Sequence, residues 1–520
     1  MTPTLPPSVA WAILTLTAAT LSLLLVFAAH RTHLLRLSKR SGPQEAREWK
    51  GELPRVTVQL PIYNEATVVR RLLDAAAALD YPRDRIQIQV LDDSTDTTSR
   101  YVAERVAFWR NQGVDMVHLH REERTGFKAG ALARGMDTAT GEFILILDAD
   151  FVPAPSLIRD LLPPFTDPTV GMVQARWDHL NEEANLFTRC QALLLDAHFF
   201  FEQGGRYAGG RFMNFNGTAG MWRRTSLESA GGWSWDTLTE DLDLSYRCQM
   251  AGWRFVFLSE VGVPAEIPES ASALEVQQKR WAQGGVQTGR KVLPRLLGGS
   301  WPLSIKLEGV VHLLGHLAYP LTLLLGVLLL PSAVARRSVG LEELLILDLV
   351  VFAGATGTFL VFYVAAGRRR KRPWSTLLPR SVATLALGIG LTAPCARAVL
   401  RGLGSSGRRD PFLRTPKRGG GSPLYARPSA RGDQVLKGAL SVWMIAGIGG
   451  AVVWDHLPSI PFLVLFAAGY TWLLLGDAVA TRTGWREGAR PATREAPGSI
   501  RRSTEVLPST RRSEQPTGGG

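Results

Sequence analysis

The chain has 520 residues, 46% of them hydrophobic, and a formal net charge of +13 at pH 7. Its three cysteines show no CxxC spacing, which argues against a structural zinc site or a disulfide framework and agrees with a reducing, cytoplasmic location. Lys and Arg cluster beside apolar segments, at 31–40, 367–372, 401–418 and 482–512. Because positive loops beside membrane spans stay in the cytoplasm, the charge needs no nucleic-acid partner.

Long apolar segments predict an integral membrane protein, since about 20 apolar residues cross a bilayer. Five segments are long enough: 9–29, 308–331, 343–366, 436–454 and 458–478. We interpret the first as an uncleaved anchor with its N-terminus outside, because basic residues follow it and none precede it. A sixth stretch, 381–400, is predicted to be an interfacial or re-entrant helix, because a span there would place the basic 401–433 loop outside.

Strands and helices alternate between the first two spans. Strands are predicted in RVTVQLPIYNE, RIQIQVLDDSTD, VDMVHL and EFILILDADFVP, and helices in EATVVRRLLDAAAAL, TSRYVAERVAFWR and FKAGALARGMDTA. This order predicts a parallel sheet with helices on both faces, with ligands bound at the carboxyl ends of the strands. No GxGxxG follows the first strand, so a dinucleotide-binding fold is not favoured.

Unusual residues lie at the ends of three predicted strands, in Pro61-Ile62-Tyr63-Asn64-Glu65, Asp92-Asp93-Ser94 and Asp148-Ala149-Asp150. Asp148 and Asp150 follow a buried strand and point to the same side of an extended chain, as ligands of Mg²⁺ would. Asp92 and Asp93 could accept hydrogen bonds from a base or a ribose, and Lys128 opens a helix where a cation suits a diphosphate. The plainer alternatives are a solvated turn, a helix cap and a surface lysine.

A second acidic group lies in WDTLTEDLDLSYRC. Glu240, Asp241 and Asp243 crowd together after Thr239, which resembles a helix cap with acids in the first turn. A partly buried carboxylate among other acids can have its pKa raised toward that of a general base. Solvated helix acids are the alternative. Aromatic residues that could stack on sugar rings, or belong to the core, precede this group: Phe212, Phe215 and Trp222, beside Asn216.

The stretch VQQKRWAQGG precedes the later spans. Helical spacing places Gln277, Arg280 and Trp281 on one face. Trp281 offers a stacking surface for a sugar, Arg280 a charge for a phosphate, and Gln277 hydrogen bonds for hydroxyls. This set suits a sugar acceptor at the mouth of a membrane pore.

The order DDS, KAG, DAD, TED and QxxRW, followed by membrane spans, resembles processive family-2 glycosyltransferases such as cellulose, mannan and hyaluronan synthases. The strings TEDLDLSYR, PAEIPES and QQKRW resemble most the cellulose-synthase-like A group, the glucomannan (β-1,4-mannan) synthases, and their bacterial relatives. The resemblance covers about residues 52–420. It implies an α/β GT-A domain inserted between transmembrane helices and a reaction that inverts the anomeric centre.

The resemblance also implies roles for residues of the nucleotide-sugar site. Asp93 and Lys128 would contact the nucleotide diphosphate, with Asp92 nearer the base. Asp148 and Asp150 would hold the nucleotide and a Mg²⁺ or Mn²⁺ ion. FLRTPK fits the FxxTxK pattern of a gating loop, in which Thr415 and Lys417 would cap the diphosphate.

Other roles concern catalysis and the acceptor. Asp241, beside Glu240, would be the general base that deprotonates the acceptor hydroxyl. The acceptor and the pyrophosphate would be positioned by Gln277, Arg280 and Trp281. A further acceptor motif of bacterial cellulose synthases resembles Asn216, Gly217 and Thr218, although this chain lacks their cysteine.

We therefore expect four regions: an anchor with a basic segment (1–50), a cytoplasmic GT-A domain (51–270), interfacial helices with four spans (271–480) and a disordered basic tail (481–520). The expected activity is polymerisation of a β-1,4-linked glucan or (gluco)mannan from UDP-glucose or GDP-mannose, with translocation of the polysaccharide across a plasma membrane, which we expect to be a bacterial inner membrane. Membrane lipid is the other expected partner, and no export partner is identified. No control by cyclic-di-GMP is expected.

Two alternatives remain at this point. A non-processive enzyme, similar to ceramide or polyprenyl-phosphate glycosyltransferases, would add one sugar to a lipid. A transporter or scaffold with an inactive transferase domain is the other, although intact acids at Asp148, Asp150 and Asp241 argue against it.

Overall fold

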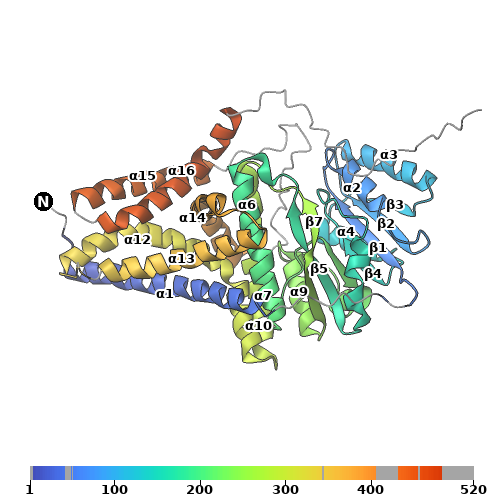
Figure 1. Cartoon of the computed structure of the whole chain (residues 1–520), viewed down its shortest axis with the longest axis horizontal. Helices are drawn as coiled ribbons and strands as arrows, with labels where there is room; N and C mark the ends of the chain where they lie inside the picture. Colours follow the sequence, from blue (N-terminus) through green and yellow to red (C-terminus); the bar gives the residue numbers. More distant parts are fainter. Residues whose placement is uncertain are drawn as a thin grey trace, which may run out of the picture.

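The computed structural model combines a mixed α/β domain with a bundle of long helices that lies beside it (Figure 1). It describes residues 4–40, 49, 51–341, 343, 345–405, 431–454 and 457–482. Thr415, Lys417 and the predicted tail from residue 483 lie outside the described residues.

The α/β domain is built on one seven-stranded sheet with the order β3-β2-β1-β4-β6-β5-β7. Its strands are β1 (Val56–Ile62), β2 (Ile86–Asp92), β3 (Met116–His120), β4 (Phe143–Ile146), β5 (Val170–His179), β6 (Gly220–Arg223) and β7 (Arg254–Ala265). β6 runs antiparallel to both β4 and β5. The prediction of a parallel sheet is therefore correct for β1 to β4 and wrong for the sheet as a whole, which is mixed.

The four predicted strands and three predicted helices of the first half are all confirmed. The helices are α2 (Val69–Ala77), α3 (Thr98–Asn111) and α4 (Phe127–Met136). β1, β2 and β4 are continuous buried runs because apolar clusters cover both faces of the sheet. Three further helices complete the domain: α5 (Leu157–Leu161), α8 (Arg224–Ser229) and α9 (Glu240–Met250).

A layer of helices joins the α/β domain to the bundle. It contains α6 (Leu186–Ala197), the π-helix η3 (His198–Gln203), α7 (Gly204–Ala208), α10 (Ala271–Gly298) and α11 (Leu303–Leu313). The first bundle helix approaches α7 closely, since a Cβ at Gly205 would lie 2.5 Å from the Leu34 carbonyl oxygen. α10 carries the QxxRW residues and so places them between the sheet and the bundle.

The bundle consists of α1 (Pro7–Ser38), α12 (Ala318–Ser338), α13 (Leu345–Arg369), α14 (Trp374–Gly404), α15 (Arg431–Val453) and α16 (Ile460–Arg482). Within the described residues, five helices are long and apolar enough to cross a membrane: Pro7–Ser38, Gly315–Ser338, Trp374–Gly404, Arg431–Val453 and Leu457–Gly476. The predicted span 343–366 falls on α13.

α14 contains the stretch that was predicted to be interfacial or re-entrant. It is one continuous helix of 31 residues, with Pro379 and Pro394 inside it, so no re-entrant break interrupts it. Figure 1 shows α14 nearly end-on, whereas α1, α12, α13, α15 and α16 run lengthwise across the view. α14 packs on α10 and α6 as well as on α12 and α16. By length it could span a membrane, and its placement at the membrane surface stays a prediction.

Candidate functional site

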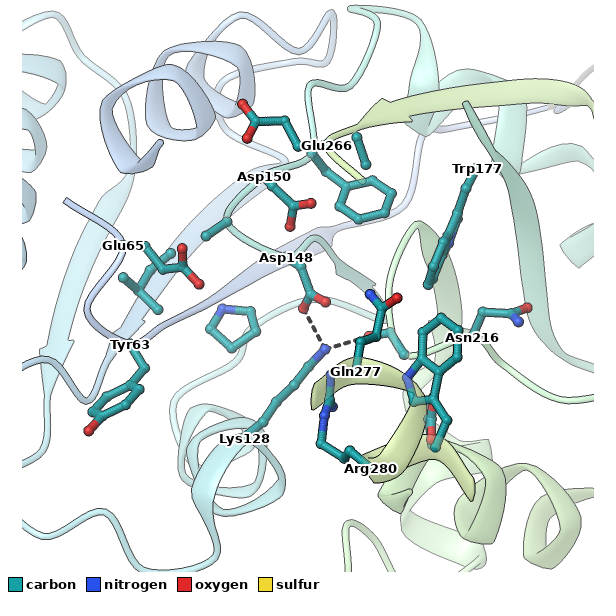
Figure 2. A pocket seen from close by; sticks show the side chains of 18 of the residues that line it. Tyr63, Glu65, Lys128, Asp148, Asp150, Trp177, Asn216, Glu266, Gln277 and Arg280 are labelled. Carbon is teal, nitrogen blue, oxygen red and sulfur yellow. Dashed lines mark hydrogen bonds and ion pairs between the residues drawn. The ribbon is translucent and has the colours of Figure 1, made fainter. Parts of the chain in front are cut away.

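A cavity opens at the carboxyl ends of β1, β2 and β4, which we call the strand-end cavity (Figure 2). Of the residues selected from the sequence it is lined by Asp93, Lys128, Asp148, Asp150, Asn216, Gly217, Glu240, Asp241, Gln277, Arg280 and Trp281. Parallel strands all end at one edge of a sheet, which explains why acids far apart in the chain meet there. Asp92 and Thr218 are buried elsewhere.

Lys128 lies at the centre of this cavity, in the first turn of α4. Its Nζ forms an ion pair with Asp148 and donates to the Gly217 carbonyl oxygen at 2.9 Å. Burial opposes the charged form, but the carboxylates of Asp148, Glu240 and Asp241 outweigh it and raise the pKa of Lys128. A fixed cation therefore faces the cavity, which suits a diphosphate.

Carboxylates from different strand ends surround the same space. Figure 2 shows Glu65 after β1 and Asp148 and Asp150 after β4 around it. Glu266 after β7 lines the cavity too and is held by Arg71, with 2.9 Å between Nη2 and Oε1. Hard divalent ions take oxygen ligands of this kind, so the donor set fits the predicted Mg²⁺ or Mn²⁺ ion.

Asp93 lines the cavity and pairs with two arginines, of which Arg124 lines the cavity too. The Arg121 guanidinium donates to both carboxylate oxygens of Asp93, at 2.7 Å each. Arg124 lies 3.8 Å from the same carboxylate and stacks on Tyr63, 3.4 Å from the ring centroid. A flat cation and a phenol ring beside a carboxylate provide stacking and hydrogen-bonding partners for a nucleobase.

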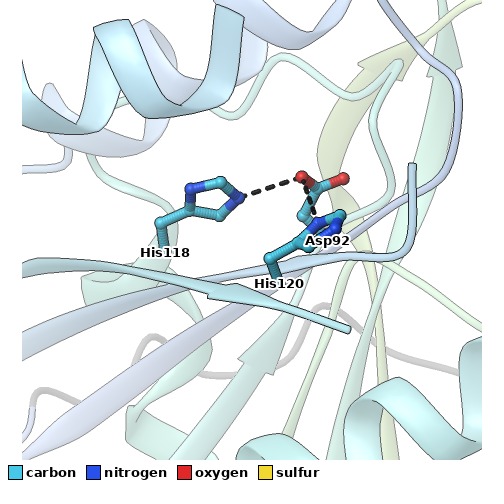
Figure 3. Close-up of side chains that lie close together, drawn as sticks. All are labelled: Asp92, His118 and His120. Atoms are coloured by element: carbon cyan, nitrogen blue, oxygen red, sulfur yellow. Dashed lines mark hydrogen bonds and ion pairs between the residues drawn. The ribbon is translucent and has the colours of Figure 1, made fainter. Parts of the chain in front are cut away.

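Asp92 does not line the cavity, because successive side chains of a strand point to opposite sides (Figure 3). Its Oδ2 lies 2.9 Å from His118 Nε2 and 3.1 Å from His120 Nδ1, and its Oδ1 accepts from the Ser94 amide. Burial opposes ionisation of Asp92, but hydrogen bonds from His118 and Ser94 hold its pKa well below the usual value. The side chains of Asp92, His118 and His120 are close enough together to hold a metal ion. Because Asp92 does not line the cavity, the geometry does not provide its expected contact with the base.

Glu240 and Asp241 begin α9 on the opposite side of the cavity. α10 holds this helix start in place, because Gln287 accepts from the Leu238 amide at 3.1 Å and Thr239 bonds to Thr288 at 3.0 Å. Burial and the neighbouring Glu240 carboxylate raise the pKa of Asp241 to about 7. A carboxyl group with this pKa can take up a proton near neutral pH, which is the property of a general base.

Asn216 and Gly217 line the cavity, whereas the next residue, Thr218, does not. Thr218 is buried and its hydroxyl accepts from the Asp148 amide at 2.8 Å, so it positions Asp148 instead of facing an acceptor. Gly217 has a φ of +83°, and a Cβ there would lie 3.0 Å from Asp241 Oδ2. The glycine thus lets the backbone pass between Lys128 and Asp241. The nearby aromatics Phe212, Phe215 and Trp222 are core residues.

A second, larger cavity of about 450 Å³ extends from the strand-end cavity into the helices, and we call it the bundle cavity. The two cavities share a wall formed by Trp177, Leu195, Asn216, Thr239, Asp241 and Trp281. Farther from this wall the bundle cavity is lined by side chains of α1, α12, α13, α14 and α16, such as Leu325, Phe352 and Phe466. The predicted base therefore faces two compartments.

Sequence reasoning singled out Tyr63 and Glu65 as part of a strand end but gave them no role. It missed five other residues that line these cavities: Arg124, Trp177, His198, Glu202 and Glu266. The sequence pointed to Glu65 because it follows a strand, as Asp93 and Asp150 do. His198 and Glu202 carry no such signal, because they lie in a helical run of aromatic residues. Only the packing of η3 against residue 216 brings them to the site.

Comparison with known proteins places the cavity residues in a recognised domain. Residues 54–284 match the family model described as "Glycosyltransferase like family 2". "Probable glucomannan 4-beta-mannosyltransferase 7" of Oryza sativa subsp. japonica is 42% identical over 248 residues, which are 47% of this chain and 42% of that protein. "Glucomannan 4-beta-mannosyltransferase 2" of Arabidopsis thaliana is 39% identical over 249 residues, 47% of each chain. The chain thus spans less than half the length of these curated relatives.

Among solved structures, a mannosyltransferase from Pyrobaculum calidifontis in complex with GDP-Man and Mn²⁺ matches with a TM-score of 0.49 and 25% identity. The match covers 71% of this chain and 99% of that one. The sequence relatives confirm the resemblance inferred from the motifs: residues 54–284 match the family-2 glycosyltransferase model, and glucomannan 4-beta-mannosyltransferases are similar to about half of the chain.

Proposed function

We propose that this protein is a membrane-embedded, inverting and processive hexosyltransferase that builds a β-1,4-linked mannan or glucomannan. GDP-mannose is the proposed donor, because the curated relatives are named mannosyltransferases. UDP-glucose is the alternative donor, since glucose and mannose differ in the orientation of one hydroxyl. The α/β domain faces the cytoplasm, where basic clusters beside the spans would hold it.

The observation that carries this proposal is the wall shared by the two cavities. Asp241 and Trp281 line both the strand-end cavity, which has the cation and acids for a nucleotide sugar, and the bundle cavity. A donor on one side and an acceptor chain on the other would meet at Asp241. A single-sugar transferase has no need of a cavity that reaches into the bundle as far as Leu325 and Phe466.

The chemistry is a single displacement at the anomeric carbon. Asp241 takes the proton from the acceptor hydroxyl, whose oxygen forms the new bond as the bond to the diphosphate breaks. Lys128 and Arg280 line the strand-end cavity. There they would face the leaving diphosphate, and fixed cations stabilise such developing charge. A Mg²⁺ or Mn²⁺ ion held by Asp148 and Asp150 would supply further positive charge to the diphosphate.

The product would leave through the bundle cavity. Trp177 and Trp281 lie at its entrance, where their rings offer flat surfaces for the newly added sugar. Polar side chains such as His198 and Arg206 follow, and the walls then become mostly apolar. A neutral polysaccharide can move along such an apolar wall because it carries no charged group that would have to enter the membrane.

The test uses inside-out membrane vesicles that contain the full chain. They are incubated with labelled GDP-mannose or UDP-glucose and with Mg²⁺ or Mn²⁺, and ethanol-insoluble label is digested with β-1,4-mannanase or β-1,4-glucanase. We expect polymer from GDP-mannose that the mannanase degrades, and none from vesicles without the protein. Label found only in an organic extract would instead assign transfer of one sugar to a lipid.

The rate of polymerisation is expected to rise with pH until it levels off above about 7. The reason is that the pKa of Asp241 is raised to about 7, so the group is protonated and unable to accept a proton below that pH. Initial rates at saturating donor would be measured from about pH 5.5 to 8.5. Donor binding at each pH is the control, and a rate that falls steadily over this interval contradicts the assignment.

Replacing Gly217 by Ala is expected to lower the transfer rate by about 100-fold, since small displacements of catalytic groups cost this much. The added Cβ would lie 3.0 Å from the Asp241 carboxylate and 3.7 Å from Lys128 Nζ. Gly210→Ala is the matched control, because Gly210 also has a positive φ, of +61°, but no atom lies within 4 Å of its added Cβ. Equal loss in both variants would point to backbone strain alone.

A further inference from the structure

The π-helix η3 brings two ionisable side chains to the shared end of the bundle cavity. π-turns are rare and often occur at functional sites. His198 and Glu202 are one turn apart in η3 and bond to each other, with 2.9 Å between Nδ1 and Oε2. Both line the bundle cavity together with Asn216, and their side chains are only about one-fifth exposed, at 24% and 20%.

The hydrogen bonds around His198 have one consistent direction. Glu202 also accepts from Arg31 Nε at 3.4 Å. Burial opposes its ionisation, but His198 and Arg31 hold the pKa of Glu202 well below its usual value, so it is a carboxylate that can only accept. His198 must therefore donate from Nδ1.

The direction of these hydrogen bonds also determines how Asn216 bonds to His198. In a neutral imidazole that donates from Nδ1, the other nitrogen is an acceptor. His198 Nε2 lies 3.0 Å from Asn216 Nδ2, which can donate to it. Gln203 Nε2 in turn donates to Asn216 Oδ1 at 2.6 Å. The amide of Asn216 is thus held at both ends, with its orientation fixed by η3.

Asn216 is the residue that this arrangement positions. It lines both cavities, as Asp241 and Trp281 do. Its amide carries a second N–H that can be donated to a sugar hydroxyl. If the amide rotated, its carbonyl oxygen would replace the N–H as the group facing an acceptor, so the bond to His198 decides which polar group an acceptor sugar meets.

We propose that His198, oriented by Glu202, is a positioning residue that fixes the Asn216 amide to receive the acceptor sugar beside Asp241. This inference rests on the proposed function. It adds His198 and Glu202, which line only the bundle cavity, where the acceptor would lie. His198 and Glu202 do not line the strand-end cavity. Loss of His198 should therefore lower the rate of transfer to the acceptor without changing the affinity for the donor.

The experiment compares His198→Ala, His198→Gln and wild type in vesicles, and measures how label from GDP-mannose divides between polymer and free mannose. Water replaces a misplaced acceptor, so His198→Ala is expected to lower polymer label by about 10- to 100-fold and to raise the share of free mannose. His198→Gln keeps an acceptor atom for the Asn216 amide and is expected to restore most of the polymer.

Two controls accompany these variants. Donor affinity, measured by calorimetry on the purified full chain, is expected to stay within about twofold of wild type, because the change lies outside the strand-end cavity. His33→Ala removes an exposed histidine of α1 that lines neither cavity. This variant is expected to divide label between polymer and free mannose as wild type does. A merely structural role of His198 would lower donor affinity and polymer together.

The outcomes separate the two proposals. If wild type binds no nucleotide sugar, the proposed function is overturned and this inference falls with it. If wild type makes polymer and His198→Ala divides label as wild type does, only the inference is overturned. Equal loss in His198→Ala and His198→Gln also overturns it, because the hydrogen bond to Asn216 would then not be what matters.

Discussion

Replacing Asp241 by Asn is expected to lower the polymerisation rate by about 10²- to 10⁴-fold, the range that a general base contributes. Asn has nearly the same shape but cannot take up the proton of the acceptor hydroxyl. Asp241 lies on the wall that the two cavities share and has a pKa raised to about 7 by burial and by Glu240. Rates would be measured in vesicles with saturating donor.

The variant should still bind the donor. Removal of one of the negative charges near Lys128 and Arg280 would, if anything, favour binding of the negatively charged diphosphate. Calorimetry on the full chain tests this, and Asp137→Asn, at an exposed site on the far end of α4, is the control. An Asp241→Asn variant that polymerises at more than about a tenth of the wild-type rate would remove Asp241 from the role of base.

Replacing Asp150 by Asn is expected to lower the rate by about 10²- to 10³-fold and to weaken the effect of Mn²⁺ on donor binding. Asp150 is 5% exposed and lines the strand-end cavity with Asp148 and Glu65. Asp148 is the poorer choice for this test, because its loss would also remove the ion pair with Lys128.

The measurement is a titration of donor binding with Mn²⁺, followed by the same titration in the presence of a chelator. Wild type is expected to bind the donor more tightly as Mn²⁺ is added, and Asp150→Asn to respond much less. Without metal the two proteins should bind alike. Asp160→Asn replaces an exposed carboxylate on the outside of the domain and serves as the control. Equal stimulation of wild type and Asp150→Asn by Mn²⁺ would contradict a metal-binding role.

The sequence predicted the strands β1 to β4 and the acids at their ends, because local patterns decide both. Apolar runs form buried strands, and parallel strands bring Asp93 and Asp148 to one edge wherever the rest of the chain lies. The motif order also sufficed to predict the family that residues 54–284 match. The proposed general base could be named for the same reason, since Asp241 lies in a short motif and in the first turn of a helix.

Other features depended on contacts between distant residues, which no local pattern encodes. The antiparallel strand β6 lies between β4 and β5, and the residues before it bring Gly217 to Lys128 and Thr218 to Asp148. Packing of α10 against α9 and of η3 against Asn216 then shaped the shared wall. By itself, the sequence therefore determined which chemical groups are available and at which edge of the sheet most of them lie. Only the tertiary structure decided that Asp241 faces two cavities and that His198 holds Asn216, because these arrangements arise from packing between segments far apart in the chain.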